Sequence, residues 1–259
     1  SFADDSGLDI IEYASAQGGG EIDLVTPGST TYLALNDADM NAFEDVDGVP
    51  TATIRPTDDN ASGLVLDAGR LTGNHRVDVT GTEFDDRIAT GEGDDIIVTK
   101  DDDAATDDGD DTVESGAGDD DITTGSGDDL VYAGDGDDTI DTGDGADEIN
   151  AGSGDDTINA GDGENDIIAG DGDDVVTSGI NADIISTGSG DDEVNAGDGE
   201  NEIQTGDGND SVTTGEDSDI IVTGEGNDVV DSGDGDDDVS TGDGDDEVTT
   251  GTGVNEVFL

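Results

Sequence analysis

Aspartate recurs through most of this chain at intervals of nine residues, and a glycine-rich stretch precedes each one. The segment GDGDDTIDTGDGADEINAG, residues 134–152, shows the pattern. Carboxylates and loop carbonyls are hard oxygen ligands, and the chain has no cysteine and only one histidine that could supply softer ones. This donor set favours a hard cation. Ca²⁺ takes about six to eight oxygen ligands in a flexible geometry, which loops can supply more easily than the strict octahedral shell of Mg²⁺.

The charge balance also makes cations the expected partners. The 259 residues include 73 Asp and Glu against 5 Lys and Arg, a formal net charge of −68. Proteins bind nucleic acids and anionic membranes through Lys and Arg, so neither is expected as a partner here. No apolar run approaches the roughly 18 residues that span a bilayer, so no transmembrane segment is expected.

A composition this acidic, with 3% aromatic residues, normally predicts a disordered chain. Too little apolar surface is available to offset the entropy that is lost on ordering. A solvated surface adapted to high salt is an additional explanation for the surplus acid at places such as Asp135, Asp144 and Glu193. Only a strong counter-signal overturns the expectation of disorder.

That counter-signal is a repeat of nine residues. It begins at Thr82, is interrupted by KDDDAAT at residues 100–106, and runs from Asp107 to Leu259 without a slip, which gives 19 nonapeptides. The seventh place is Ile or Val in all 19, and the fifth is Asp except at Asn165, Asn201 and Asn255. The first place is Gly in 17 repeats and the third is Gly in 16.

Each nonapeptide is predicted to form a six-residue turn and a three-residue strand whose middle, seventh-place side chain points inward. One β-branched residue per strand is enough only if successive strands stack into a solenoid. The fourth place is Asp or Asn in every alternate repeat, so two nonapeptides are expected to form one coil. The alternating residues are Asp94, Asp119, Asp137, Asp155, Asp173, Asp191, Asn209, Asn227 and Asp245.

The G-x-G-x-D-x-U-x pattern, with U as Ile or Val, resembles the RTX (repeats-in-toxin) family over residues 82–259. The resemblance implies an all-β fold, a right-handed parallel β-roll with Ca²⁺ in its turns. It also implies that first- and third-place carbonyls and fifth-place Asp side chains of successive coils surround each ion. The family usually has Gly before the first place, whereas this chain has Thr, Ala or Ser, as at Thr142, Ala151 and Ser178.

The resemblance assigns calcium ligands on the two edges of the roll. One edge is expected to hold the more complete ion column, and the other is expected to have weaker or missing sites near Asn165, Asn201 and Asn255. The implied carboxylate ligands are Asp95, Asp120, Asp138, Asp156, Asp174, Asp192, Asp210, Asp228 and Asp246 on the first edge and Asp111, Asp129, Asp147, Asp183, Asp219 and Asp237 on the second. The implied carbonyl donors are Gly116, Gly118, Gly134, Gly136, Gly152, Gly154, Gly170, Gly172, Gly188, Gly190, Gly206, Gly208, Gly224, Gly226, Gly242 and Gly244.

Residues 1–81 lack the nine-residue period but contain short β-like runs separated by Gly, Pro, Asn and Asp. A repeat stack needs an end that hides its apolar column, so this part is expected to be a β-rich cap or small domain. Residues 82–259 are then the calcium-binding roll.

The leading functional hypothesis is a secreted or cell-surface structural protein that folds on binding several Ca²⁺ ions. It would form part of a surface layer, adhesin, fibre or matrix and could associate with itself or with lattice partners. The alternative is the folding and secretion module of a larger type I-secreted toxin or hydrolase. No enzyme is expected within the chain, because His75 has no H-E-x-x-H around it and no G-x-S-x-G occurs.

Overall fold

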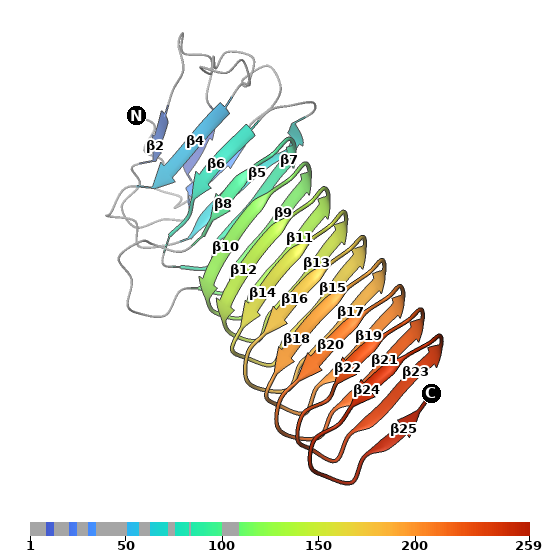
Figure 1. Ribbon diagram of the computed structural model, residues 1–259. Helices are drawn as coiled ribbons and strands as arrows, with labels where there is room; N and C mark the ends of the chain where they lie inside the picture. Colours follow the sequence, from blue (N-terminus) through green and yellow to red (C-terminus); the bar gives the residue numbers. More distant parts are fainter. Residues whose placement is uncertain are drawn as a thin grey trace. The chain divides into compact units, whose positions relative to one another are not determined.

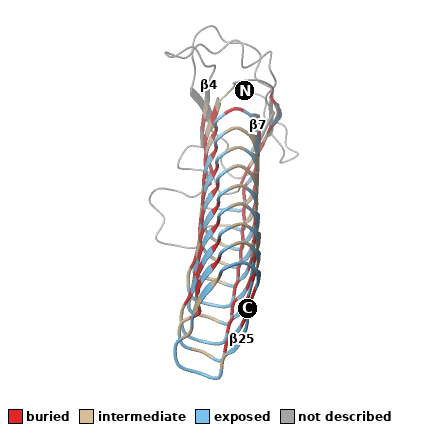
Figure 2. Cartoon of the chain, turned by 45° about the vertical axis from the view of Figure 1, so that its right-hand side comes forward, coloured by how far each residue is buried: buried red, intermediate tan, exposed pale blue. Residues whose placement is uncertain are grey.

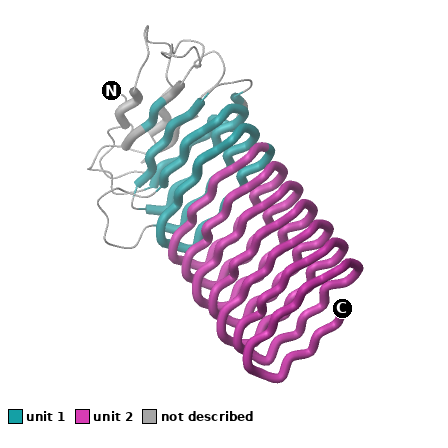
Figure 3. The backbone as a smooth tube through the Cα atoms, viewed as in Figure 1, with its two compact units in different colours: residues 1–135 teal, residues 136–259 magenta. Residues whose placement is uncertain are grey.

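The computed structural model describes residues 9–12, 21–24, 31–34, 51–56, 63–71, 76–82, 84–99 and 109–259. The chain divides into two compact units, residues 1–135 and 136–259 (Figure 3). The described residues form strands and turns without a helix.

The first unit contains strands β1 to β11. Its odd-numbered strands lie side by side in one parallel sheet and its even-numbered strands in another (Figure 1). The strands are β1 Asp9–Glu12, β2 Glu21–Leu24, β3 Thr31–Ala34, β4 Thr51–Pro56, β5 Leu64–Leu71, β6 Arg76–Thr80, β7 Arg87–Glu92, β8 Ile96–Val98, β9 Thr112–Ala117, β10 Asp121–Ser126 and β11 Leu130–Asp135.

The second unit contains strands β12 to β25 in the same alternating arrangement. The strands are β12 Thr139–Asp144, β13 Glu148–Ser153, β14 Thr157–Gly161, β15 Asp166–Asp171, β16 Val175–Ser178, β17 Ile184–Ser189, β18 Glu193–Gly197, β19 Glu202–Asp207, β20 Ser211–Thr214, β21 Ile220–Glu225, β22 Val229–Asp231, β23 Asp238–Asp243, β24 Glu247–Thr249 and β25 Glu256–Phe258. Each unit is therefore a parallel β-solenoid with two strands per coil.

The strand register confirms the predicted coil of two nonapeptides. Ile149 pairs with Ile167 and Ile140 with Ile158, each 18 residues apart. Where the seven extra residues occur, Val113 still pairs with Ile88. The interruption at residues 100–106 lies outside the described residues, and the strands on either side of it keep their register. The predicted all-β parallel β-roll is confirmed.

The interior is a column of seventh-place side chains, as predicted, but the strands are longer than predicted. The prediction of a three-residue strand with one inward residue was wrong for most repeats. β12 spans six residues, and both Ile140 and Thr142 are buried. Buried residues recur along the described strands of successive coils (Figure 2). Strand geometry places alternate side chains on one face, so the ninth place points inward together with the seventh. A small Thr, Ser or Ala at the ninth place fills the space next to each Ile or Val.

Candidate metal centres

The fifth-place carboxylates point into the solenoid rather than into solvent. We call them the inner aspartates and define the first edge as the turns that lead from an odd-numbered to an even-numbered strand. Turns that lead from an even-numbered to an odd-numbered strand form the second edge. Asp156 and Asp174 on the first edge are each 1% exposed, and so is Asp183 on the second. All the predicted carboxylate ligands are buried except Asp246, which is half-buried.

Each inner aspartate links its coil to the preceding one. Oδ1 of Asp174 accepts a hydrogen bond of 2.9 Å from the backbone N–H of Asp156. Oδ1 of Asp192 accepts one of 2.9 Å from the N–H of Asp174, and the second edge repeats the pattern between Asp183 and Asn165. Such charge-assisted bonds satisfy buried N–H groups of the turns. One oxygen of each inner carboxylate therefore has a structural role.

The second carboxylate oxygen is the candidate metal ligand. Within the described part of the chain, Oδ2 of Asp156, Asp174, Asp183 and Asp219 is buried and has no hydrogen-bond partner. Burial raises the pKa of Asp156 to about 6 and that of Asp174 to about 7, and neighbouring carboxylates add to both shifts. A buried carboxylate oxygen without a donor is costly unless a cation neutralises it.

In the repeats with Asn at the fifth place, the side-chain amide supplies a hydrogen-bond donor where the other repeats have a carboxylate oxygen. Nδ2 of Asn201 donates to the carbonyl oxygen of Gly199 at 3.1 Å, and Nδ2 of Asn165 donates to that of Gly163 at 3.4 Å. The fifth-place side chain therefore reaches the third-place carbonyl of its own turn. Where Asp replaces Asn, two acceptors share this region, and a cation between them would satisfy both.

Third-place carbonyls align along each edge because the coils approach closely at glycine. A Cβ added to Gly154 would lie 2.0 Å from the carbonyl oxygen of Gly136. Gly154 also has a φ of +133°, which side-chain-bearing residues rarely adopt. The two non-glycine third places in the same region of φ are Asn181 and Asp217, residue types that tolerate it.

Calcium at these turns would need backbone oxygens as well as carboxylates. The described residues contain no group of three or more His, Cys, Asp or Glu side chains placed to hold a metal ion. The turn carbonyls of glycines such as Gly136 and Gly154 would complete the shell around an inner carboxylate. This mixed set of oxygen donors fits Ca²⁺ and is a poor fit for transition metals.

An outer column of fourth-place side chains runs beside the first edge. Oδ1 of Asp137 accepts a hydrogen bond of 2.9 Å from the N–H of Asp155, and Asp155 accepts one of 2.9 Å from Asp173. The pattern continues through Asn209, whose oxygen accepts from the N–H of Asn227 at 3.0 Å. Such a bond needs a short side chain with an acceptor oxygen, which Asp or Asn supplies at each of these fourth places of the first edge.

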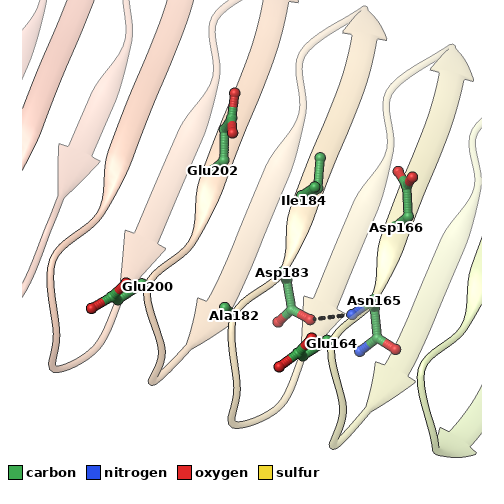
Figure 4. Close-up of a pocket in the computed structure, with 8 residues that line it drawn as sticks. All are labelled: Glu164, Asn165, Asp166, Ala182, Asp183, Ile184, Glu200 and Glu202. Carbon is green, nitrogen blue, oxygen red and sulfur yellow. Dashed lines mark hydrogen bonds between the residues drawn. The ribbon is translucent and has the colours of Figure 1, made fainter.

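The second edge has a shallow acidic pocket around Asp183 (Figure 4). Its volume is about 400 Å³, and Asp183 accepts from the backbone N–H of Asn165 beside it. The residues that line it are Glu164, Asn165, Asp166, Ala182, Asp183, Ile184, Glu200 and Glu202. The fourth places here are Glu164, Ala182 and Glu200 instead of Asp or Asn, so the outer hydrogen-bond column of the first edge is not reproduced at this pocket.

The geometry agrees with the family to which the chain belongs. The model of the RTX calcium-binding nonapeptide repeat matches residues 78–104, 105–140, 141–176, 159–194, 177–212 and 213–248. These matches span about two-thirds of the chain, and the protein is a member of this calcium-binding repeat family. No curated protein sequence matched the chain.

Sequence reasoning placed the inner aspartates correctly on two edges but overlooked the ninth place. That place is Thr, Ser or Ala in 18 of the 19 repeats, a restriction that could have identified it as an interior position. The predicted glycines of the first edge have positive φ, with Gly244 the exception. His75 lies outside the described residues. No described helix is long and apolar enough to span a membrane.

Proposed function

We propose that the inner aspartates and the first- and third-place glycine carbonyls bind Ca²⁺ between successive coils and that the ions hold the solenoid together. The observation that carries this proposal is that some carboxylates of the buried column, among them Asp156 and Asp174, have a second oxygen with no donor in the described residues. The carboxylates that would hold the ions are those assigned to the two edges in the sequence analysis. Calcium supplies the positive charge that the interior lacks, and the chain's own residues fix the coil spacing.

Occupancy is expected to differ between the two edges. The first edge has an uninterrupted column of Asp at the fifth place, whereas the second has Asn165, Asn201 and Asn255. The amide groups of Asn165 and Asn201 already donate to the turn carbonyls. Ions should therefore be fewer or weaker beside these asparagines.

The role that we propose for the folded protein is structural, at the cell surface or outside the cell. Millimolar Ca²⁺ outside cells matches the roughly 10⁻⁴ to 10⁻³ M affinities of extracellular calcium modules. The described strands of both units belong to stacked parallel sheets, an architecture suited to a surface layer, adhesin, fibre or matrix. Self-association or lattice contacts would be the partners of such a protein.

We also propose that two parts of the chain have different roles. Residues 1–81 would act as a β-rich cap and residues 82–259 as the calcium-binding roll. Strands β4, β5 and β6 support this, because they continue the two-sheet arrangement although they lack the nonapeptide pattern. They bury larger side chains such as Ile54, Leu64 and Leu66.

A crystal structure grown with Ca²⁺ and examined by anomalous scattering tests the sites directly. The proposal expects ions beside Asp156 and Asp174 and weak or absent peaks beside Asn165 and Asn201. Equal occupancy at all turns would contradict the difference between the edges. Light scattering during a Ca²⁺ titration tests the role: sheets or filaments favour a structural protein, whereas a monomer at every concentration favours a folding module of a larger protein.

A further inference from the structure

The ninth-place side chain lies inside the solenoid, five residues before the inner aspartate of the next turn. Along the first edge of the second unit the ninth place changes from Ala at residues 151 and 169 to Thr at residues 187, 205, 223 and 241. Thr205 and Ala169 are fully buried, so the hydroxyl that Thr has and Ala lacks lies in the interior.

In the threonine segment, the nearest acceptor of each hydroxyl is Oδ2 of the inner aspartate. The hydroxyls of Thr187, Thr205 and Thr223 also lie 3.2 to 3.3 Å from a carbonyl oxygen of the next coil, at a longer distance. Oγ1 of Thr205 lies 2.5 Å from Oδ2 of Asp210, and the same bond recurs in the neighbouring coils. The other pairs are Thr187 with Asp192 at 2.5 Å, Thr223 with Asp228 at 2.5 Å and Thr241 with Asp246 at 2.7 Å. Both oxygens of these carboxylates accept hydrogen bonds, because Oδ1 accepts from the backbone of the preceding coil.

In the alanine segment, the inner aspartate has no such donor. Ala151 and Ala169 precede Asp156 and Asp174, and Oδ2 of each aspartate is buried without a hydrogen-bond partner in the described residues. Both aspartates keep the Oδ1 bond to the preceding coil. The two segments therefore differ in whether Oδ2 of the inner aspartate accepts a hydrogen bond.

On the second edge, ninth-place hydroxyls differ in whether they donate to Oδ2 of the inner aspartate or to a carbonyl oxygen. The hydroxyls of Ser178 and Thr214 donate to carbonyl oxygens of the next coil, at 3.1 Å and 3.0 Å. Oδ2 of Asp219 has no hydrogen-bond partner as far as the structure is described, although the nearby Thr214 hydroxyl opposes the rise in the pKa of Asp219 that burial causes. The hydroxyl of Ser232 donates instead to Oδ2 of Asp237 at 2.7 Å.

We propose that the ninth-place side chain sets how strongly each inner carboxylate of the first edge depends on calcium. Asp156 and Asp174 are the calcium-dependent positions, and Asp192, Asp210 and Asp228 are positions that threonine partly satisfies without metal. A hydrogen bond to a charged group stabilises the metal-free fold, and calcium must then compete with that bond for Oδ2. This inference rests on the proposed calcium sites and adds the residues that tune them.

The inference predicts that the solenoid responds unevenly to calcium. As Ca²⁺ is lowered, β14 and β16, which follow Asp156 and Asp174, should lose amide protection before β20 and β22, which follow Asp210 and Asp228. Repeat proteins permit such segmental unfolding because each coil contacts only its neighbours.

The test compares the variants Thr205→Val and Ala169→Ser with the unmodified chain. Thr205→Val removes the hydroxyl and keeps the shape, while Ala169→Ser adds a hydroxyl at the place that Thr occupies in later coils. Circular dichroism at the calcium concentration that half-folds the unmodified chain gives the ratio of folded to unfolded protein. That ratio should fall about tenfold in Thr205→Val and rise severalfold in Ala169→Ser. Thr205→Ser, which retains the donor, should stay within about twofold.

Urea unfolding at saturating Ca²⁺ separates tuning from simple packing. There the Thr205→Val midpoint should match that of the unmodified chain, because the ion neutralises Asp210. If Thr205→Val loses as much stability at saturating Ca²⁺ as at low Ca²⁺, the inference is overturned. It is also overturned if the ratio of folded to unfolded protein is unchanged in both Thr205→Val and Ala169→Ser at the half-folding Ca²⁺ concentration. If the unmodified chain folds to the same extent with and without Ca²⁺, the proposed function itself fails, and this result is distinct from the other two.

Discussion

The backbone N–H of Asp156 donates a hydrogen bond of 2.9 Å to Oδ1 of Asp174, the corresponding residue one coil further along the chain. One oxygen of Asp174 thus joins two coils, while Oδ2 is buried and, in the described residues, receives no donor. The same side chain stabilises the coil spacing through one atom and requires positive charge at the other. This division between the two oxygens explains how so acidic a chain can form an ordered interior.

Replacing Asp174 separates its two roles. Asp174→Asn keeps an acceptor for the Asp156 N–H and adds a donor like that of Asn165, so we expect higher stability without metal and fewer bound ions. Asp174→Ala leaves a buried N–H unsatisfied and should cost about 1–3 kcal/mol with or without metal. Urea unfolding together with calcium counting by native mass spectrometry measures both effects. Similar behaviour of the two variants would argue against separate roles.

The reverse change at Asn201 should create a calcium-dependent turn. Nδ2 of Asn201 donates to the Gly199 carbonyl at 3.1 Å, and Asn201→Asp replaces that donor with a buried charge. The variant should be less stable than the unmodified chain at a low Ca²⁺ concentration that still folds the unmodified chain, and it should recover at saturating Ca²⁺. Thermal unfolding in both buffers checks this, with Asn201→Ala as the control that removes the donor without adding charge. A variant that is equally destabilised in both buffers would count against a site at this turn.

Close coil contact and a positive φ require glycine at the third place of the turn that contains Gly154. A Cβ on Gly154 would lie 2.0 Å from the Gly136 carbonyl oxygen, and the φ of +133° adds strain. Gly154→Ala should therefore reduce stability at every Ca²⁺ concentration and lower calcium affinity, as measured by calorimetric titration. Glu193→Ala, at an exposed place on β18, is the matched control and should change neither quantity appreciably. Unaltered calcium binding in Gly154→Ala would contradict the role given to this turn.

The seventh-place column should contribute stability independently of metal. Ile158 is 1% exposed, and Ile158→Ala should cost about 2–5 kcal/mol because it opens a cavity in the column. Ile184 is 53% exposed on the outer face of β17, so Ile184→Ala should have little effect. Urea unfolding at saturating Ca²⁺ compares the two. Equal losses would show that the inward and outward faces had been assigned wrongly.

Burial of the inner carboxylates predicts an unusual pH dependence without metal. Burial raises the pKa of Asp174 to about 7, above the ordinary value of about 3.9 in an unfolded chain. The folded form therefore binds more protons between about pH 4 and pH 7. This contribution to stability is complete below about pH 4 and is lost as the pH rises through about 7.

The β content in chelator, measured by far-UV circular dichroism, should accordingly rise when the pH is lowered from about 8 to about 5. In Ca²⁺ the trend should weaken or reverse, because the metal requires deprotonated ligands. Asp174→Asn should make the β content in chelator less dependent on pH. A β content that falls on acidification in chelator would contradict the assigned burial of these groups.

The repeat determined most of what could be predicted about the solenoid. Nineteen Ile or Val residues at one place fixed the inward face, and the alternation at the fourth place fixed two strands per coil. Strand length was underestimated because small ninth-place residues such as Ala151 and Ser178 carry no strong β signal. They are nevertheless buried beside the seventh-place column.

The different roles of Oδ1 and Oδ2 in each inner aspartate could not be predicted from the sequence. The Thr205 hydroxyl lies 2.5 Å from Oδ2 of Asp210 and 3.2 Å from the carbonyl oxygen of Thr223, whereas the hydroxyls of Ser178 and Thr214 donate to carbonyl oxygens of the next coil; this difference in distance depends on local packing. The regions without the repeat, such as residues 1–81, offered only short apolar runs. Several long-range pairings were compatible with those runs.

The most direct test of the central claim is far-UV circular dichroism of the whole chain, first in chelator at low ionic strength and near neutral pH, and then during a Ca²⁺ titration. We predict a largely unfolded spectrum in chelator and a cooperative change to a β spectrum in Ca²⁺ that excess chelator reverses. Mg²⁺ at the same concentration should not produce that change. A full β spectrum in chelator, unaltered by added Ca²⁺, would contradict the account.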